Sequence, residues 1–179
     1  MAFNVTEFRA NLIGDGARPN LFQVSLTFPA FANSPVAGQR LSFLAKAAQL
    51  PGSSIGTTTQ HYFGRELKFA GNKTFPDWSL TIINDEDFNV RNAFETWLDG
   101  LNSHGLNIRN PAAANQLLYT TDASVTQFSK IGLPLKTYKF VGVFPTDVSP
   151  IDLDWGSNDS MEEFGVTLAY QWWESDTTS

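Results

Sequence analysis

The stretch from residue 69 to residue 101 constrains the fold most, because its hydrophobic pattern changes from that of a strand to that of a helix. Trp78, Leu80 and Ile82 are separated by Ser79 and Thr81, which is the two-residue period of a half-buried strand. Apolar residues then recur at helical spacing, as on one face of an amphipathic helix: Val90, Phe94, Trp97, Leu98 and Leu101. We therefore predict a strand followed by one helix over about Asp85–Leu101.

A polar segment, Asn84 to Asp87, joins the predicted strand to the predicted helix. The side chain of Asn84 or Asp85 is expected to cap free backbone N–H groups at the helix start. The acidic residues that follow suit the positive end of the helix dipole. The sequence holds no second clear helix signal, so the remaining segments are expected to form a sheet that this helix covers.

Alternating apolar and polar residues predict several further strands. Four patterns are clear and one is weaker: Leu21–Phe28, Leu41–Ala48, Lys136–Phe144 and Phe164–Trp172, with the weaker pattern inside Leu117–Lys130. A chain of 179 residues is expected to form a single domain, residues 1–179, with an N-terminal arm at 1–16 and a flexible tail at 175–179. The expected class is mainly β or α+β, a rolled antiparallel sheet, β-sandwich or barrel with one packed helix.

Composition excludes several kinds of partner and site. No apolar run is long enough to span a membrane, and the absence of cysteine excludes disulfides and thiolate metal ligands. The net charge is −6, and no Lys or Arg follows Lys139. Gripping a phosphate backbone requires clustered basic residues, so we do not expect this chain to hold nucleic acid, although nucleic acid could still pass along it.

The candidate chemical sites are weak, and we predict no catalytic residue, metal site or cofactor. His61 and His104 lie in loop-like segments without a ligand set around them. Asp152, Asp154 and Glu163 stand at the first, third and twelfth positions of a calcium loop. The glycine of that segment falls at the fifth position and a strand follows, so a solvated acidic loop is the better interpretation.

The residues favour an interaction protein instead. The Gly52–Gln60 segment is rich in Ser, Thr and Gly and has few core residues, so it is expected to be a long exposed loop or an edge hairpin that needs a partner. A sheet with open edges must pair with other chains, be blocked, or close on copies of itself.

Ordered blocks of sequence then show a family resemblance. They are Ala17–Val24, Lys46–Gly52, Ala70–Trp78, Asn84–Asp85, Gly142–Val148, Leu153–Trp155 and Phe164–Tyr170. In this order they resemble the tail tube proteins of contractile-tailed bacteriophages, over most of the chain from Ala17 to Glu174. The arm, the Pro29–Gly38 excursion and the stretch His104–Asn115 depart from that pattern.

The resemblance implies a structural role. Subunits of that family form hexameric rings that stack into a hollow tube, with strands of all subunits joined in one barrel around the lumen and the helix outside. The implied partners are other copies of the chain, the tail sheath, baseplate and tail-terminator proteins, and tape-measure protein and genomic DNA in the lumen, bound without sequence specificity and without a membrane. The implied location is the virion tail, after assembly in the host cytoplasm.

We expect two regions to contact neighbouring subunits. The first region lacks a core of its own and consists of Gly52, Ser53, Ser54, Ile55, Gly56, Thr57, Thr58, Thr59, Gln60, Tyr62 and Phe63. The second belongs to the N-terminal arm and consists of Glu7 and Phe8. The alternatives are a tube protein of a type VI secretion or phage-derived injection system, a monomeric carbohydrate-binding β-sandwich using Tyr170, Trp172 and Trp173, and a hydrolase built on Asp152 and Asp154.

Overall fold

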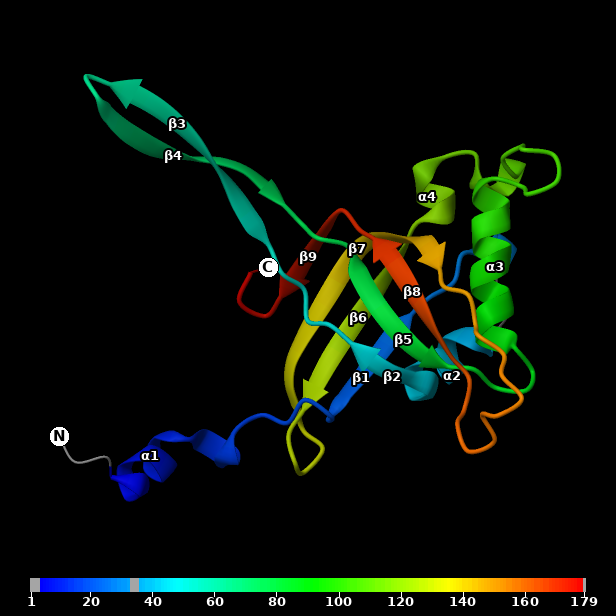
Figure 1. The fold of residues 1–179 in the computed structure, drawn as a ribbon, viewed down its shortest axis with the longest axis horizontal. Helices are drawn as coiled ribbons and strands as arrows, with labels where there is room; N and C mark the ends of the chain where they lie inside the picture. The colour runs from blue at the N-terminus through cyan, green and yellow to red at the C-terminus, as the bar shows by residue number, and fades with distance from the viewer. Residues whose placement is uncertain (1–3, 33–35, 179) are drawn as a thin grey trace.

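The computed structural model describes residues 4–32 and 36–178 as a curled antiparallel sheet with a helix packed on it and long projections (Figure 1). Its strands are β1 (Phe22–Leu26), β2 (Ala45–Ala48), β3 (Ser54–Tyr62), β4 (Arg65–Thr74), β5 (Trp78–Ile83), β6 (Thr121–Phe128), β7 (Pro134–Val148), β8 (Glu163–Ala169) and β9 (Trp172–Ser175). Its helices are α1 (Val5–Asn11), α2 (Ala37–Leu44), α3 (Asn89–Leu101) and α4 (Gln116–Tyr119), with short 3₁₀ turns at Ile13–Asp15, Ala30–Ala32 and Pro111–Ala113. The predicted mainly-β, α+β class is confirmed.

Strand β7 organises the sheet because it takes part in two halves of it. The strand order is β1-β6-β7-β8-β5-β2, and β9 also pairs with β7. The first part of β7 lies between β6 and β9, whereas residues from Phe144 onward pair with β8. Between the two parts lies Gly142, with φ of 69°, and a Cβ placed there would lie 2.8 Å from Cγ of Gln171. Only glycine fits this left-handed, crowded position, so the sheet bends here.

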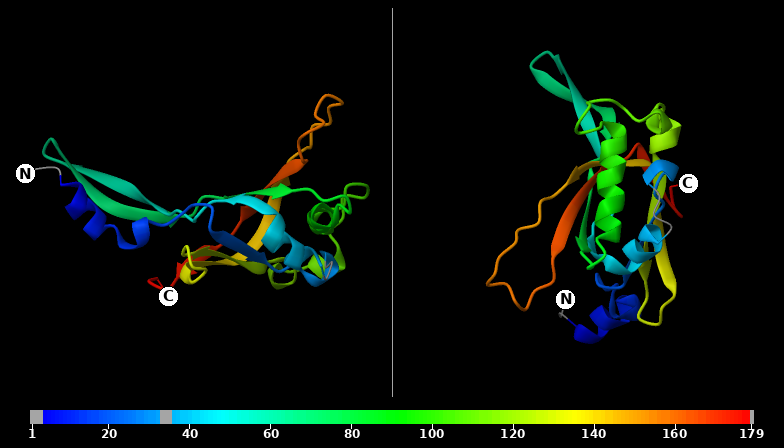
Figure 2. Two further views of the ribbon diagram at one scale, coloured as in Figure 1. Left: turned by 90° about the horizontal axis from the view of Figure 1, so that it is seen from below. Right: turned by 90° about the vertical axis from the view of Figure 1, so that its right-hand side faces the viewer.

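The core lies inside the curled sheet and under α3. Trp78 of β5 stacks on Phe140 of β7 with ring centroids 4.2 Å apart. The buried face of α3 is the predicted one, with Val90, Phe94 and Trp97 turned inward. Figure 2 shows α3 lying lengthwise against the side of the sheet. The predicted strand-to-helix unit is therefore the centre of the core.

The start of α3 differs from the prediction. The helix begins at Asn89 rather than Asp85, and its N-cap is Phe88, with φ of 52° and no side-chain cap. The carboxylates of Asp85 and Asp87 instead accept hydrogen bonds from Arg40 of α2, at 2.7 and 2.8 Å. The predicted capping by Asn84 or Asp85 is wrong, because the acidic segment ties α2 to the chain that enters α3.

Further predictions need correction at specific places. The Leu41–Ala48 strand is half helix, because Ala37, Leu41 and Leu44 lie at helical spacing and turn toward the core in α2. The prediction of a single helix is also wrong, because the described residues form α1, α2 and α4 as well as α3. The Phe164–Trp172 strand is two strands, β8 and β9, separated by a bend at Gln171, and buried Ser175 belongs to β9.

Candidate assembly surfaces

The β3–β4 hairpin projects from the body and contains most of the predicted contact residues (Figure 1). Strands β3 and β4 pair only with each other among the described strands, and all nine residues of β3 are exposed. Residues Ser54–Gln60 and Tyr62 lie on β3, Phe63 lies in the turn, and exposed Gly52 and Ser53 precede the strand. The edge-hairpin alternative is confirmed, and the segment packs none of its side chains into the core, as predicted.

The two faces of the hairpin differ in chemistry. Register places Tyr62 opposite Arg65, Gln60 opposite Leu67 and Thr58 opposite Phe69, so the large apolar side chains share one face. The other face carries polar pairs, including Thr59 with Lys68 and His61 with Glu66. Exposed apolar side chains on one face of a free hairpin are typical of a surface that another molecule covers.

The tip of the hairpin holds an aromatic residue in an unfavourable backbone conformation. The two-residue turn between Tyr62 and Arg65 is formed by Phe63 and Gly64, with φ of 45° and 76°. A positive φ at both positions suits a tight hairpin, but a bulky first residue is strained there, where Asn is preferred. The Phe63 ring is 93% exposed and meets Tyr62 edge-on at 4.6 Å. Strain at an exposed aromatic indicates a role outside the monomer.

The N-terminal arm is a second projection. Residues 4–16 of the predicted arm are described, and Glu7 and Phe8 lie on α1, where every residue is exposed. The side chain of Asn4 caps this helix by accepting the N–H of Thr6 at 3.0 Å. The arm and the hairpin point away from the body in different directions (Figure 1), so the structure does not bring the two predicted contact regions together.

The sheet leaves strand edges open that the sequence did not reveal. Strand β1 pairs only with β6, and β9 pairs only with β7, among the described residues. Residues that lie opposite one another on neighbouring strands form rows across this half of the sheet. One such lateral row consists of Ser25, Ser124, Lys139 and Glu174. An unpaired edge is a template for a strand of another chain. The sequence did not indicate the β9 edge, because the predicted Phe164–Trp172 strand ran from β8 into β9 without a break.

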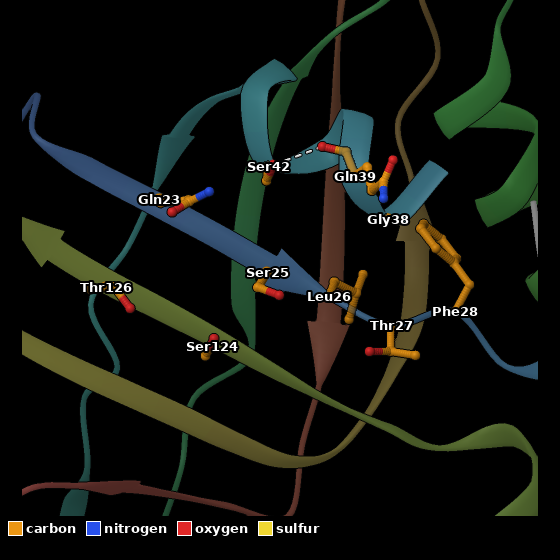
Figure 3. Close-up of a pocket in the computed structure, with 10 residues that line it drawn as sticks. All are labelled: Gln23, Ser25, Leu26, Thr27, Phe28, Gly38, Gln39, Ser42, Ser124 and Thr126. Carbon is orange, nitrogen blue, oxygen red and sulfur yellow. Dashed lines mark hydrogen bonds between the residues drawn. The ribbon is translucent and has the colours of Figure 1, made fainter. Parts of the chain in front are cut away.

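A polar groove of about 470 Å³ lies between α2 and the outer side of β1 and β6 (Figure 3). Its polar lining is uncharged: Gln23, Ser25 and Thr27 from β1, Gln39 and Ser42 from α2, and Ser124 and Thr126 from β6. Amides and hydroxyls hydrogen-bond readily without imposing a charge. The groove follows the strand whose outer edge is unpaired, so it has room and chemistry for a polypeptide segment.

The residues weighed as chemical sites have ordinary roles. His104 contacts Asp99 at 3.1 Å on the surface, and no group of metal-binding side chains occurs in the described part of the chain. The Tyr170 and Trp173 rings pack against Phe140 and Tyr138, so Tyr170, Trp172 and Trp173 do not present one sugar-stacking platform. None of the described helices has the length and hydropathy of a membrane span.

Among the described residues, two side chains have clearly shifted pKa values, and each keeps its usual protonation state at neutral pH. The hydrogen bonds that Arg40 donates to the carboxylates of Asp87 and Asp85 raise the pKa of Arg40, so its guanidinium stays charged. Burial raises the pKa of Tyr170, with a smaller effect of the Asp77 charge, so its phenol stays neutral. Neither shift prepares a group for proton transfer.

Comparison with known proteins identifies the family. The phage tail tube protein family matches residues 17–176. The chain belongs to this family. It is 34% identical to the tail tube protein gp19 of Enterobacteria phage T4 over 167 residues, covering 93% of this chain and 96% of that protein. The tail tube protein of Serratia phage KSP90 is 28% identical over 168 residues, or 93% of each chain. The chain is accordingly a structural component of a phage tail.

Solved structures support the fold of this tail tube protein. A chain of the six-fold symmetrised anti-feeding prophage baseplate has a TM-score of 0.61 at 15% identity, covering 89% of this chain and 94% of that one. A chain of an extracellular contractile injection system, from a sheath–tube complex, has a TM-score of 0.58 at 16% identity, covering 98% and 99%. The predicted recognition from ordered sequence blocks is confirmed.

Proposed function

We propose that six copies of this tail tube protein form a ring and that the rings stack into a hollow conduit inside a contractile sheath. The observation that carries this proposal is the half-sheet β1-β6-β7-β9, whose four strands are antiparallel throughout and whose two outer edges pair with no other strand in the described part of the chain. A copy placed beside it presents β1 antiparallel to β9. Repetition of this heterologous contact continues the sheet from subunit to subunit until it closes as a barrel.

A pair of cysteines tests this contact without background, because the chain has no cysteine of its own. Ser25→Cys combined with Glu174→Cys puts thiols on one lateral row at the two open edges. Mild oxidation of the assembled protein is expected to give a ladder of disulfide-linked species that ends at six subunits. Non-reducing electrophoresis reads the ladder.

The control for this experiment pairs Ser25→Cys with Asp99→Cys, at an exposed position of α3, and is expected to give no ladder. Strands in a barrel are staggered, so Glu174 of one copy can face a row next to that of Ser25 in the other copy. Glu174→Cys is therefore also combined with Gln23→Cys or with Thr27→Cys. Rings visible by electron microscopy without a ladder from any of these pairs would contradict the β9–β1 contact.

The outer face of the same half-sheet suits a lumen through which DNA passes. Its row positions carry mainly hydroxyl and amide groups, and Nζ of Lys139 lies 3.2 Å from a carboxylate oxygen of Asp122. A duplex binds proteins largely by neutralising phosphates, and the described residues of this face form no cluster of cations for that purpose. DNA and a tape-measure protein would therefore move along it without sequence-specific binding.

The remaining partners are those that the resemblance to phage tail tube proteins implies. Sheath subunits would cover the outside, baseplate and terminator proteins would contact the two end rings, and assembly would take place in the host cytoplasm without any enzymatic step. The identity with phage tail tube proteins, 34% against 15–16% for injection-system chains, favours a phage tail over a phage-derived injection device.

The hairpin is the proposed contact between rings. Because its tip is strained, a substitution there can change assembly without lowering the stability of the free protein. Phe63→Asn is expected to leave the melting temperature of the free protein unchanged or slightly higher, because Asn is favoured at positive φ. The same change removes an exposed ring and is expected to shorten the tubes seen by negative-stain electron microscopy. Phe43→Ser, at an 83% exposed position on α2, is the matched control and should leave tube length unchanged. Normal tubes from Phe63→Asn would show that the ring has no part in stacking.

A further inference from the structure

The hairpin carries positive charge as well as aromatic groups. Residues 54–74 contain Arg65, Lys68 and Lys73 against the single carboxylate of Glu66, in a chain whose net charge is −6. No ion pair within the described structure involves these cations. Arg65 follows the turn that carries exposed Tyr62 and Phe63, Lys68 lies on the opposite face of the hairpin, and Lys73 lies near its base, over the Phe75 ring. A surface of this kind fits a partner surface that is acidic and apolar.

The loop between β7 and β8 has the complementary composition. Its apolar side chains are strongly exposed, with Leu153 at 80%, Trp155 at 100% and Met161 at 75%. The same loop carries four carboxylates: Asp152, Asp154, Asp159 and Glu162. The loop lines a groove of about 380 Å³ that includes Leu153 and Met161 together with several of these acids. A fully exposed tryptophan beside a groove is the type of residue that anchors protein interfaces.

We propose that the β7–β8 loop of one ring receives the hairpin of a second copy in the next ring. This inference rests on the proposed stacking of rings and adds the acceptor surface. In Figure 1 the hairpin leaves the body at the upper left and the loop leaves it at the lower right, so the two surfaces lie apart, as the two halves of an open-ended, head-to-tail contact must. The hairpin supplies cations and aromatics, and the loop supplies carboxylates and Trp155. The α1 arm is also apolar, but its Glu7 and Arg9 offset each other, so it lacks the matching charge.

Reciprocal charge reversal tests the pairing. Arg65→Glu with Lys68→Glu makes the hairpin acidic, and Asp152→Lys with Asp154→Lys makes the loop basic. Each double variant places like charges together and is expected to reduce pelletable tubes by about tenfold or more in low salt. A chain with all four changes restores opposite charges and is expected to form tubes again. The defects should shrink as salt is raised, because exposed pairs are screened.

Controls keep folding and general charge effects apart from the contact. Glu86→Lys with Asp99→Lys makes the same charge change as the loop variant at exposed positions near α3 and should leave tubes intact. Circular dichroism and thermal unfolding of each free variant should match wild type, since the changed side chains are exposed.

The outcomes distinguish the two proposals. Wild-type protein that forms neither rings nor tubes would overturn the proposed function and this inference with it. Wild-type tubes that are lost on hairpin reversal and not restored by the fourfold variant would overturn the acceptor alone. Normal tubes from the loop variant, including tubes that no longer take up sheath, would assign the loop to another partner and also overturn the inference.

Discussion

Replacing residues 54–74 with a short Gly-Ser linker is expected to leave the body of this tail tube protein folded and to abolish the stacking of rings. The hairpin strands pair with no other described strand, and all of their residues are exposed except Gly71, which is half-buried. Its removal therefore costs the core almost no apolar burial. At the base, Trp173 still donates its indole N–H to the Gly52 carbonyl at 3.0 Å, which holds the linker start in place.

The measurement combines thermal unfolding of the free protein with electron microscopy and sedimentation after assembly. The deletion variant should melt within a few degrees of wild type and form rings without tubes, because the ring contact proposed for β1 and β9 is untouched. A full-length control with Tyr62→Ser, Phe63→Asn, Leu67→Ser and Phe69→Ser keeps the strands and removes the apolar face; it should show the same loss. Tubes of normal length from the deletion variant would contradict the hairpin as the contact between rings.

Sequence reasoning succeeded where burial on one side sets the pattern. Trp78, Leu80 and Ile82 alternate because β5 has one face in the core, and α3 keeps an apolar stripe because only one side of it meets the sheet. The hairpin was found for the converse reason, since a segment without core residues has nothing to pack against in its own chain. These signals are local and survive without knowledge of the fold.

The misses have physical causes that local patterns do not contain. Helix α2 has eight residues, too few for its period to stand out from an alternating pattern. The alternation of residues 164–172 continues across Gln171, so the exchange of β8 for β9 beside β7 leaves no trace in the pattern. The acidic segment before α3 resembles a cap until Arg40, distant in sequence, is seen to bind it.

The candidate assembly surfaces likewise include one that local sequence patterns indicate and others that depend on the fold. Exposed residues of the hairpin could be named from sequence. The segment that holds Leu153 and Trp155 was predicted to be a solvated acidic loop, but the exposure of these two apolar side chains is known only from the structure. Open edges are properties of the folded sheet, because β1 and β9 become edges only through the pairings of β6 and β7. A contact between copies needs two surfaces, and of the two proposed above sequence patterns indicated only the hairpin.

Trp97→Ala is expected to cause the largest loss of stability of any single change in the body. Its side chain is fully buried, stacks near Phe94 with centroids 6.2 Å apart, and meets Phe28 edge-on at 5.8 Å. Its indole N–H also donates to the Tyr119 carbonyl at 2.8 Å. Truncation leaves a cavity and an unsatisfied carbonyl, so the free energy of unfolding should fall by about 3–5 kcal/mol. Denaturant unfolding of the free protein, followed by circular dichroism, measures this loss.

Trp155→Ala is the matched control, because it removes the same side chain from a 100% exposed position. Its unfolding free energy should stay within about 0.5 kcal/mol of wild type. Trp97→Phe keeps most of the volume and loses the hydrogen bond, so it should lie between the two. An equal effect of Trp97→Ala and Trp155→Ala on the free protein would contradict the packing of α3. If the two effects differ as expected, a defect of Trp155→Ala in tube formation cannot be attributed to unfolding and must arise between subunits.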